Sequence, residues 1–435
     1  LILTILLSKN INNYIWGLPM ILLLMGTHLF FTFRLGFIQK KTLKGVKYSV
    51  TKEPGATGDI SSFATLATTL AATIGTGNIV GVSTAVAMGG PGAIFWCWLT
   101  GFLGMATSYA ECYLSVLFRK KAKDGTYRGG PMYILEDGLN SKVFGGLFAL
   151  FTLIASYGVG CSTQANSITA ATTSLWNLSP YVVGFIVAIL VGLVIVGGVK
   201  KIGQVCVKLV PAMGAFYIIG CLILLVLNRD YIFSAFNLII KSAFSTHALA
   251  GGILGNTIKL AARYGISRGL FTNEAGLGSA GIAAATAKTK NPARQALVSM
   301  TATFWDTVIM CSITGLVIVT NILKFPNSLS GFTSGELTSA AFSQIPYIGE
   351  LMLGISLIAF AIATLLGWSF FGERACEYLF GEKSINLYRI GYIVMIFIGS
   401  IMSLDLVWEL SDLVNAFMAI PNLIGILCLH KKIKT

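Results

Sequence analysis

The sequence predicts an all-α protein that crosses a membrane about eleven times. Three observations support this fold class. Of 435 residues, 55% are hydrophobic and 11% are charged, whereas soluble domains carry about 25% charged residues. Apolar runs of about 20 residues, the length needed for one crossing, recur along the chain. Two of these runs carry glycines and polar residues near their centres, in residues 71–83 and 269–279.

The apolar runs define the predicted spans in chain order. The first run, 14–33, lacks a cleavage-like ending, so we expect a retained helix and not a signal peptide. The basic segment 34–52 that follows is expected to be partly helical, amphipathic and located at the membrane surface. The ten further spans are predicted at residues 61–88, 93–118, 143–174, 181–199, 206–227, 261–287, 296–323, 349–371, 387–403 and 406–429.

The connections between spans differ in composition. Residues 89–92, Gly-Gly-Pro-Gly, predict a turn, and residues 119–131 are basic and glycine-rich. Residues 228–259 are more polar and amphipathic. Residues 324–346 are rich in Ser, Gly and Thr and are a candidate cap over one side of the protein.

The basic residues predict the orientation in the membrane. When segment 34–52 is cytoplasmic, most of the 31 Lys and Arg residues fall on the same side. Cytoplasmic loops carry such an excess of positive charge. We therefore expect a multi-pass plasma-membrane protein with its amino terminus outside and its carboxyl terminus in the cytoplasm. The net charge of +14 follows from this topology, so it indicates no nucleic-acid partner and no lipid partner beyond the bilayer.

The residues that usually form catalytic or metal centres are scattered. The eight cysteines lie mostly inside apolar segments, and the three histidines are far apart in the sequence. No CxxC or HExxH motif occurs, and no paired-Asp motif occurs either. We expect buried free cysteines, no resident metal centre and no intramembrane enzyme.

Residues 75–78, Gly-Thr-Gly-Asn, interrupt the second span. Each glycine costs a helix about 1 kcal/mol relative to alanine. Irregular backbone is tolerated inside a membrane only where protein buries it or where it lines a wet cavity. Residues 271–276, FTNEAG, interrupt the seventh span in the same way. We interpret both segments as helices broken at mid-membrane.

The positions of the two breaks predict a transporter. Without the first span, the chain divides into two units of five spans, 61–227 and 247–429, and each unit begins with a broken helix. Since five is odd, the units start on opposite faces, which gives an inverted repeat within one domain, 1–435. Broken helices at matching places in two such units indicate a binding site at the midplane. The alternative is that the glycines only permit close helix packing, but Asn and Thr beside them favour a site.

Three stretches resemble one known family. They are GTGNIVGVSTAVAMGGPGAIFWCW at 75–98, GGPMYILEDGL at 129–139 and RYGISRGLFTNEAGLGSAGIAAATAKT at 263–289. They are similar to the alanine/glycine:cation symporters, the sodium:alanine symporter family. The resemblance implies a LeuT-type fold and uptake of alanine or glycine driven by sodium, the co-transported ion. Gly281 departs from the family pattern, which has proline after Gly-Ser-Ala; this affects the start of a half-helix and none of the proposed ligands.

A small zwitterionic substrate needs a partner at each end. The amides of Thr76, Gly77 and Asn78, at the start of a half-helix, are candidate donors to its carboxylate. Candidate acceptors for its ammonium are carbonyls near Phe271 and Thr272 and the side chains of Asn273 and Gln164. Gln164 has the alternative role of an interhelical hydrogen bond. Asn273 has the alternative role of a cap on the following half-helix.

The ninth span carries Thr364, Trp368 and Phe371 at helical spacing. Thr364 and Trp368 are one turn apart and are predicted to face one cavity. With Phe271 opposite, Trp368 leaves room for little more than a methyl side chain. The alternative is that Trp368 is an ordinary packing residue.

The resemblance to LeuT-type transporters also implies two sodium sites. One uses the carbonyls of Ala71, Ile74 and Ala361 with the hydroxyl of Thr364. The other uses Thr73, Asn78 and Thr272 beside the substrate carboxylate.

Three acidic residues fall inside predicted spans, where charged side chains are usually functional. Glu274 lies in the second break, Glu111 in the third span and Asp306 in the eighth. We expect Glu274 to accept amide hydrogens in a structural role, although it is also a candidate carrier of a coupling proton. Asp306 is expected to pair with an arginine or to line the cytoplasmic path.

These features predict sodium-coupled symport of small neutral amino acids by alternating access. The main alternative is a proton-coupled symporter that uses Glu274 or Glu111. A channel is a further alternative, and it predicts neither saturable uptake nor counterflow. The oligomeric state is left open.

Overall fold

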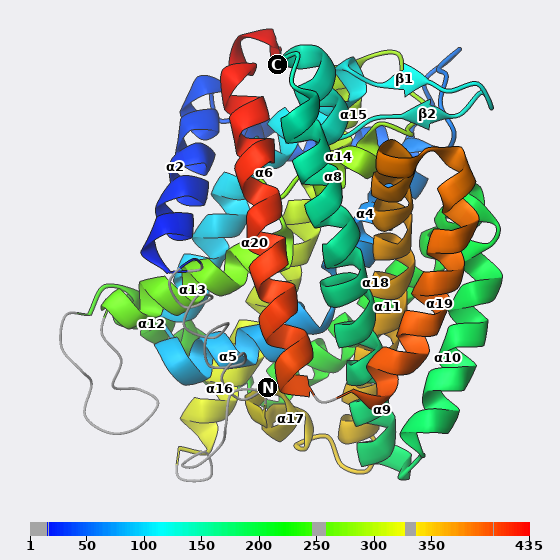
Figure 1. Ribbon diagram of the computed structural model, residues 1–435. Coiled ribbons are helices and arrows are strands. Elements are labelled where there is room, and N and C mark those ends of the chain that lie inside the picture. The colour runs from blue at the N-terminus through cyan, green and yellow to red at the C-terminus, as the bar shows by residue number, and fades with distance from the viewer. Residues whose placement is uncertain (1–14, 16, 246–257, 327–335, 403) are drawn as a thin grey trace.

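A computed structural model describes residues 15, 17–245, 258–326, 336–402 and 404–435. This part of the chain is almost entirely helical, as predicted (Figure 1). Its two strands, β1 (Lys120–Lys121) and β2 (Tyr127–Arg128), pair antiparallel as a short hairpin within the glycine-rich segment 119–131. The sequence analysis predicted a loop there, because two-residue strands leave no periodic pattern.

The helices follow the predicted apolar runs. They are α2 (Leu18–Arg34), α3 (Thr42–Val50), α4 (Ser62–Thr73), α5 (Val80–Gly89), α6 (Ala93–Leu117), α7 (Pro131–Tyr133), α8 (Lys142–Tyr157), α9 (Thr163–Trp176), α10 (Pro180–Ile195), α11 (Gly198–Leu227), α12 (Ile232–Ala243), α13 (Ile258–Asn273), α14 (Ser279–Ala284), α15 (Pro292–Thr303), α16 (Ser312–Lys324), α17 (Glu336–Phe342), α18 (Gly349–Phe380), α19 (Ile385–Ile401) and α20 (Leu404–Cys428). Short π-helical stretches join α8 to α9 and α15 to α16.

Several described helices are long and apolar enough to cross a membrane. Five meet this test singly, and two bent helix pairs raise the number to seven if each pair forms one span. The five are Lys142–Trp176, Gly198–Leu227, Pro292–Lys324, Gly349–Phe380 and Glu382–Ile401. Two shorter apolar helices are Pro180–Ile195 and Leu413–Cys428. The protein is therefore a multi-pass membrane protein, while the count of eleven spans stays a prediction.

The predicted spans over α6 and over α13 with α14 are not among these helices. Neighbouring helices cover most of α6, including Glu111, and they also cover the C-terminal half of α13. A helix enclosed by other helices does not need an apolar surface toward lipid. A test based on mean hydropathy therefore misses such a helix even where it lies within the membrane.

Local sequence explains where several helices begin. The Ser61 hydroxyl accepts a hydrogen bond from the Ala64 amide at 3.1 Å and caps α4. The Asn291 side chain caps α15 by accepting from the Ala293 amide at 2.9 Å, and Pro292 occupies the first turn. Such residues satisfy amides that have no partner within the helix.

The helices pack in two main groups. In one group α6 contacts α2, α13, α14 and α15; in the other α18 contacts α8 and α9, and α19 contacts α9 and α10. Helix α4 contacts members of both groups, α15 and α18. The first break thus begins at a helix between the two groups.

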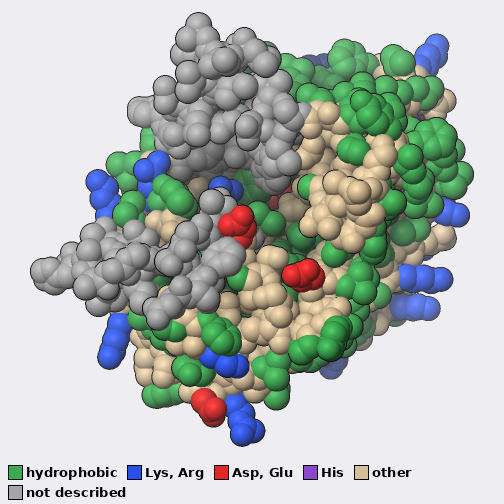
Figure 2. Space-filling model, turned by 90° about the horizontal axis from the view of Figure 1, so that it is seen from below, with side chains coloured by type: hydrophobic (Ala, Val, Ile, Leu, Met, Phe, Trp, Pro, Cys, Tyr) green, Lys and Arg blue, Asp and Glu red, His purple; other side chains and the backbone are tan. Residues whose placement is uncertain are grey.

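The ends of the molecule differ. The hairpin and the carboxyl terminus lie at one end, and α17 lies at the other (Figure 1). Figure 2 views the end opposite the carboxyl terminus, where hydrophobic side chains, uncharged side chains and backbone make up most of the surface that the described residues form in this view. Helix α3 confirms the expected helix in segment 34–52. Parts of four predicted features lie outside the described residues: residue 14 of the first span, 247–257 of the second five-span unit, 327–335 of the loop 324–346 and 403 of the span 387–403.

Candidate functional site

The first break lies between α4 and α5, whose axes are bent by 62°. Gly75 is extended, with φ −136° and ψ −159°, and residues Thr76–Asn78 form one 3-10 turn. The Gly75 amide donates to Asn78 Oδ1 at 2.9 Å. In an unbroken α-helix the same amide would donate to the Ala71 carbonyl. The Asn78 side chain therefore replaces a helical hydrogen bond and stabilises the open turn.

The amides of Thr76 and Gly77 make no hydrogen bond to any residue that the structure describes. Thr76 is 4% exposed and Asn78 is fully buried. Buried backbone amides nearly always have a partner. Two neighbouring amides in this state, just before α5, are suited to donate to an anionic group.

The second break lies between α13 and α14. Glu274 adopts a left-handed conformation with φ 52°, and Gly276 and Gly278 have φ 91° and 90°. Non-glycine residues rarely adopt this conformation and do so mostly at functional sites. The first predicted break, 75–78, is irregular backbone. The second was predicted at 271–276, but Phe271, Thr272 and Asn273 still belong to α13, and the irregular backbone runs from Glu274 to Gly278.

Side chains from α6 and α20 hold the second break. The Gly276 amide donates to Glu111 Oε2 at 3.2 Å, and Asn422 Nδ2 donates to the Gly276 carbonyl at 2.8 Å. Asn422 Nδ2 also donates to Glu111 Oε2 at 3.0 Å. Glu274 accepts from the Ser279 hydroxyl at 2.6 Å and not from amides as predicted. The carboxylate that accepts a backbone amide of the break is that of Glu111 and not that of Glu274, because α6 passes beside the break.

The first break lies against the C-terminal turn of α13, just before the second break. A methyl group at Gly77 would lie 3.4 Å from Thr272 Oγ1 and 3.9 Å from Phe271 Cδ1. A methyl group at Gly75 would lie 3.0 Å from Thr364 Oγ1. Because Gly75 and Gly77 have no side chains, α13 can approach the break on one side and α18 on the other. Residues predicted for the substrate and for sodium are thereby in contact.

Four of the predicted site residues bury a polar side-chain atom that has no hydrogen-bond partner in the described chain: Thr73 Oγ1, Gln164 Oε1, Asn273 Nδ2 and Trp368 Nε1. Such atoms also occur elsewhere, for example Gln295 Oε1. Their presence in four residues chosen from sequence is consistent with ligand contacts, because buried polar groups seldom stay unpaired.

Gln164 and Trp368 lie beside the π-helical stretch Gly158–Ser162. Gln164 Nε2 donates to the Val159 carbonyl of the same stretch at 3.1 Å. This hydrogen bond lies within one span, so the alternative of an interhelical hydrogen bond by Gln164 Nε2 is wrong. Trp368 packs against Gly160, where any side chain would overlap its Cβ.

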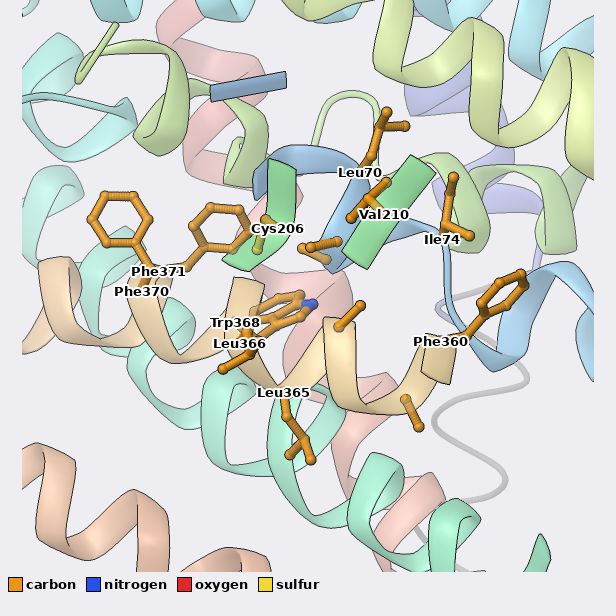
Figure 3. Close-up of a cluster of buried hydrophobic side chains, with 14 of the residues drawn as sticks. Leu70, Ile74, Cys206, Val210, Phe360, Leu365, Leu366, Trp368, Phe370 and Phe371 are labelled. Carbon is orange, nitrogen blue, oxygen red and sulfur yellow. The ribbon is translucent and has the colours of Figure 1, made fainter. Parts of the chain in front are cut away.

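Trp368 is completely buried on α18, near Leu70 and Ile74 of α4 (Figure 3). Its ring contacts that of Phe371, with centroids 5.8 Å apart. The described residues show no ring pair between Trp368 and Phe271. The aromatic pair that was predicted to limit substrate size therefore stays a prediction.

Asn273 Oδ1 accepts from the Ala275 amide at 3.0 Å, and Asn273 Nδ2 has no partner among the described residues. An amide oxygen has two lone pairs, so the role of Asn273 as an acceptor for the substrate ammonium stays a prediction. Asn273 also caps the turn inside the break and not α14, whose N-cap is Gly278.

Asp306 belongs to the site, although the sequence analysis left its role open. Its Oδ1 accepts from Asn78 Nδ2 at 2.7 Å and its Oδ2 from the Thr307 hydroxyl at 2.7 Å. The predicted arginine partner is absent from the ion pairs of the described residues. Asp306 lies in the π-helical stretch Phe304–Cys311. Sequence gives no signal for this local widening, so the direction of the carboxylate was not predictable.

The elements that carry the residues of the first proposed sodium site meet where α18 crosses α4. A methyl group at Gly367 would lie 2.7 Å from the Ala72 amide nitrogen, which shows how closely the helices approach. Thr364 donates to the Phe360 carbonyl at 3.0 Å, so its oxygen can still accept or coordinate. Ala71, Ile74 and Ala361 are buried on the same two elements. Unwound backbone carbonyls are the usual ligands of transported sodium.

Comparisons with known proteins point to one family. The profile of the sodium:alanine symporter family matches residues 3–435. The sodium/alanine symporter AgcS of Methanococcus maripaludis is 48% identical over 430 residues, which cover 97% of this chain and 94% of that protein. A Bacillus subtilis protein, the putative sodium/proton-dependent alanine carrier protein YrbD, is 33% identical over 97% of this chain and 89% of its own length.

One solved structure shows a related fold. It is the substrate-bound outward-open state of a Na+-coupled sialic acid symporter, with a TM-score of 0.58 and 11% sequence identity. The match covers 96% of this chain and 99% of that chain. At this identity the likeness concerns the fold alone.

Proposed function

The chain belongs to the sodium:alanine symporter family, and from this premise we propose that it moves small neutral amino acids into the cell together with sodium. Alanine and glycine are the proposed substrates. The observation that carries the proposal is the contact between two broken helices, one of which presents the unpaired Thr76 and Gly77 amides.

The substrate carboxylate binds at the start of α5. The Thr76 and Gly77 amides donate to it, and the half-helix dipole adds favourable partial charge. Asn78 uses both ends of its amide within the protein, so its side chain shapes the turn. Its backbone amide, which was predicted as a third donor, donates to the Gly75 carbonyl at 3.2 Å.

The substrate ammonium binds on the opposite side. Gln164 Oε1 is the side-chain acceptor, because Nε2 of the same residue already donates to the Val159 carbonyl. Carbonyls near Phe271 and Thr272 supply the other acceptors. The Asn273 Oδ1 atom, which accepts one amide hydrogen, is a further candidate acceptor. Trp368 and Phe271 limit the side chain to about a methyl group.

Sodium occupies sites formed by uncharged oxygens. One site combines the Ala71, Ile74 and Ala361 carbonyls with Thr364. The other combines Thr73, Asn78 and Thr272, and the Thr73 hydroxyl is available because it has no partner in the described protein. Each sodium that enters gains about 2.3 kcal/mol per 100 mV of membrane potential, so the coupled step is electrogenic.

The proposed cycle is alternating access. Sodium and substrate bind from outside between the two breaks, and one helix group then moves relative to the other and exposes the site to the cytoplasm. Eleven spans arranged as an inverted repeat, 61–227 and 247–429, with the added helix 14–33, give this geometry. The amino terminus is outside in this arrangement.

Uptake of radiolabelled alanine into proteoliposomes tests the proposal. We expect accumulation with an inward sodium gradient and none when choline replaces sodium. Accumulation that is indifferent to sodium would exclude sodium coupling.

The second candidate function is proton-coupled symport. The buried carboxylates of Glu111 and Glu274 beside the second break favour it. Accumulation driven by a pH gradient in sodium-free buffer supports this alternative. Counterflow by preloaded alanine distinguishes either carrier from a channel, which shows none.

A further inference from the structure

Two short segments that continue the broken helices pair with each other. Residues 57–60 lead into α4, and residues 286–289 follow α14. The Asp59 amide donates to the Thr286 carbonyl at 2.8 Å, and the Lys288 amide donates to the Ile60 carbonyl at 2.8 Å. Ile60 and Ala287 form a parallel bridge. The two half-helices are thus tied together at the end of the molecule where the hairpin lies.

The Arg119 guanidinium, at the end of α6, joins both segments. Its Nη1 donates to the carbonyls of Ala285 and Ala287 at 3.2 and 2.7 Å. Its Nη2 donates to the carbonyls of Thr289 and Thr57 at 2.7 and 3.2 Å. A guanidinium can address several acceptors because its donors are fixed in one plane. Its acceptors here are four backbone carbonyls from the two segments.

The hairpin supports the same junction. The Tyr127 ring lies 4.4 Å from Arg119 Cζ, and the Tyr127 hydroxyl donates to Thr57 Oγ1 at 3.0 Å. The Tyr127 amide donates to the Asp59 carboxylate at 3.0 Å. Strand β2 therefore positions both the arginine and residues 57–59.

A cavity of about 1,250 Å³ opens directly beside this junction. Asp59 and Ile60 line it, as does Lys288, and on the far side α11 contributes residues such as Gly203 and Lys208. Gly203 lies against Ile60 and Ala64, so α11 supports the start of α4 where Ile60 lines the cavity.

We propose that Arg119 is a latch that holds the two broken helices together at their cytoplasmic ends, and that its release from the carbonyls of residues 57 and 285–289 is a required step of inward opening. The proposal rests on the transport function above. Arg119 acts through backbone carbonyls and does not touch the substrate, so it is a positioning residue.

A reversible cross-link tests the latch. Adjacent strands lie about 4.8 Å apart, which is within the range that a disulfide spans, so Ile60→Cys with Ala287→Cys can form one. Cys428, the exposed native cysteine among the described residues, is replaced by serine in all variants. The single-cysteine variants are the matched controls.

We expect the oxidised double variant to bind alanine, seen as a sodium-dependent thermal shift, but not to transport it in proteoliposomes. A reductant should restore transport. Transport by the oxidised protein at the rate of the reduced protein would overturn the latch. Failure of the single-cysteine variants to bind alanine would instead count against the proposed function, so the two failures are distinguishable.

Hydrogen exchange measured by mass spectrometry tests Arg119 itself. In Arg119→Gln we expect exchange of the Asp59 and Lys288 amides to rise about tenfold, because these amides open only when the segments separate. The matched control is Arg389→Gln on α19, which loses a donor to the Val196 carbonyl and to Glu373 and should leave both rates unchanged. Unchanged exchange of these two amides in Arg119→Gln would contradict the proposal. If Arg119→Gln folds poorly, the Ile60→Cys and Ala287→Cys cross-link still tests the proposal.

Discussion

Asn78 Nδ2 donates to the carboxylate of Asp306 at 2.7 Å, although the two residues are separated by 228 positions in the chain. The other end of the same amide, Oδ1, accepts from Gly75. One side chain thus connects the open turn of the first break to the π-helical stretch of the eighth predicted span. The shape of the turn depends on this contact.

Replacing Asn78 should disrupt the turn. Asn78→Ala leaves the Gly75 amide and the Asp306 carboxylate without their partner, which should lower the free energy of unfolding by about 1–3 kcal/mol. We also expect the thermal shift caused by alanine to disappear. Asn166→Ala is the control, because Asn166 donates to the Met402 carbonyl away from the breaks. A full alanine shift in Asn78→Ala would contradict the assignment.

Removing the Thr73 hydroxyl should affect sodium and not stability. Thr73 Oγ1 has no partner in the described protein, so Thr73→Val breaks no hydrogen bond within it. We expect an unchanged melting temperature without ligand and a several-fold higher sodium concentration for half-maximal uptake. Thr69→Val, which loses a hydrogen bond to the Thr65 carbonyl, should leave the sodium dependence unchanged. Equal sodium dependence in both variants would rule out Thr73 as a ligand.

Gln164 is predicted to accept from the substrate ammonium. Gln164→Leu removes the unpaired Oε1 and keeps about the same volume. We expect alanine binding to weaken by about tenfold or more, the effect of losing a hydrogen bond to a charged group. Isothermal titration of purified protein measures this change. Gln295→Leu, which also removes a buried unpaired Oε1, should bind alanine normally; if it weakens binding equally, the effect is not specific to the site.

The indole of Trp368 is predicted to limit substrate size. In Trp368→Leu we expect thermal shifts from larger neutral amino acids such as leucine, together with a weaker response to alanine. Phe370→Leu is the control, because Phe370 is equally buried on the same helix and is not a predicted site residue. Unchanged selectivity in Trp368→Leu would assign Trp368 to ordinary packing.

Glycine at position 278 is required by the second break. Gly278→Ala places a side chain at φ 90°, with its Cβ 2.5 Å from Pro131 Cγ and 2.9 Å from Phe148 Cε2. The backbone strain alone costs about 1–3 kcal/mol, so we expect a clearly lower melting temperature. Gly81→Ala, in α5, meets nothing within 4 Å and should be neutral or stabilising. Similar melting temperatures for the two variants would show that the break tolerates a side chain.

Much of the fold was predictable because its signals are local. The glycines in residues 75–78 and 271–276 predict broken helices, and apolar runs predict helices such as α11 and α18. Gly281 also has a local explanation that only the structure supplies: Ser115 of α6 packs against it so closely that any side chain would overlap. The neighbouring helix therefore accounts for this departure from the family pattern.

The sequence by itself determined which segments are helical and which two helices are broken, because both depend on residues close together in the chain. Only the tertiary structure decided that Asp306 binds Asn78, that Glu111 rather than Glu274 accepts an amide of the second break, and that Arg119 joins residues 57 and 289. These contacts depend on how helices distant in sequence cross, and small local changes such as the π-helical stretches set the direction of each side chain. No pattern of composition or spacing contains that information.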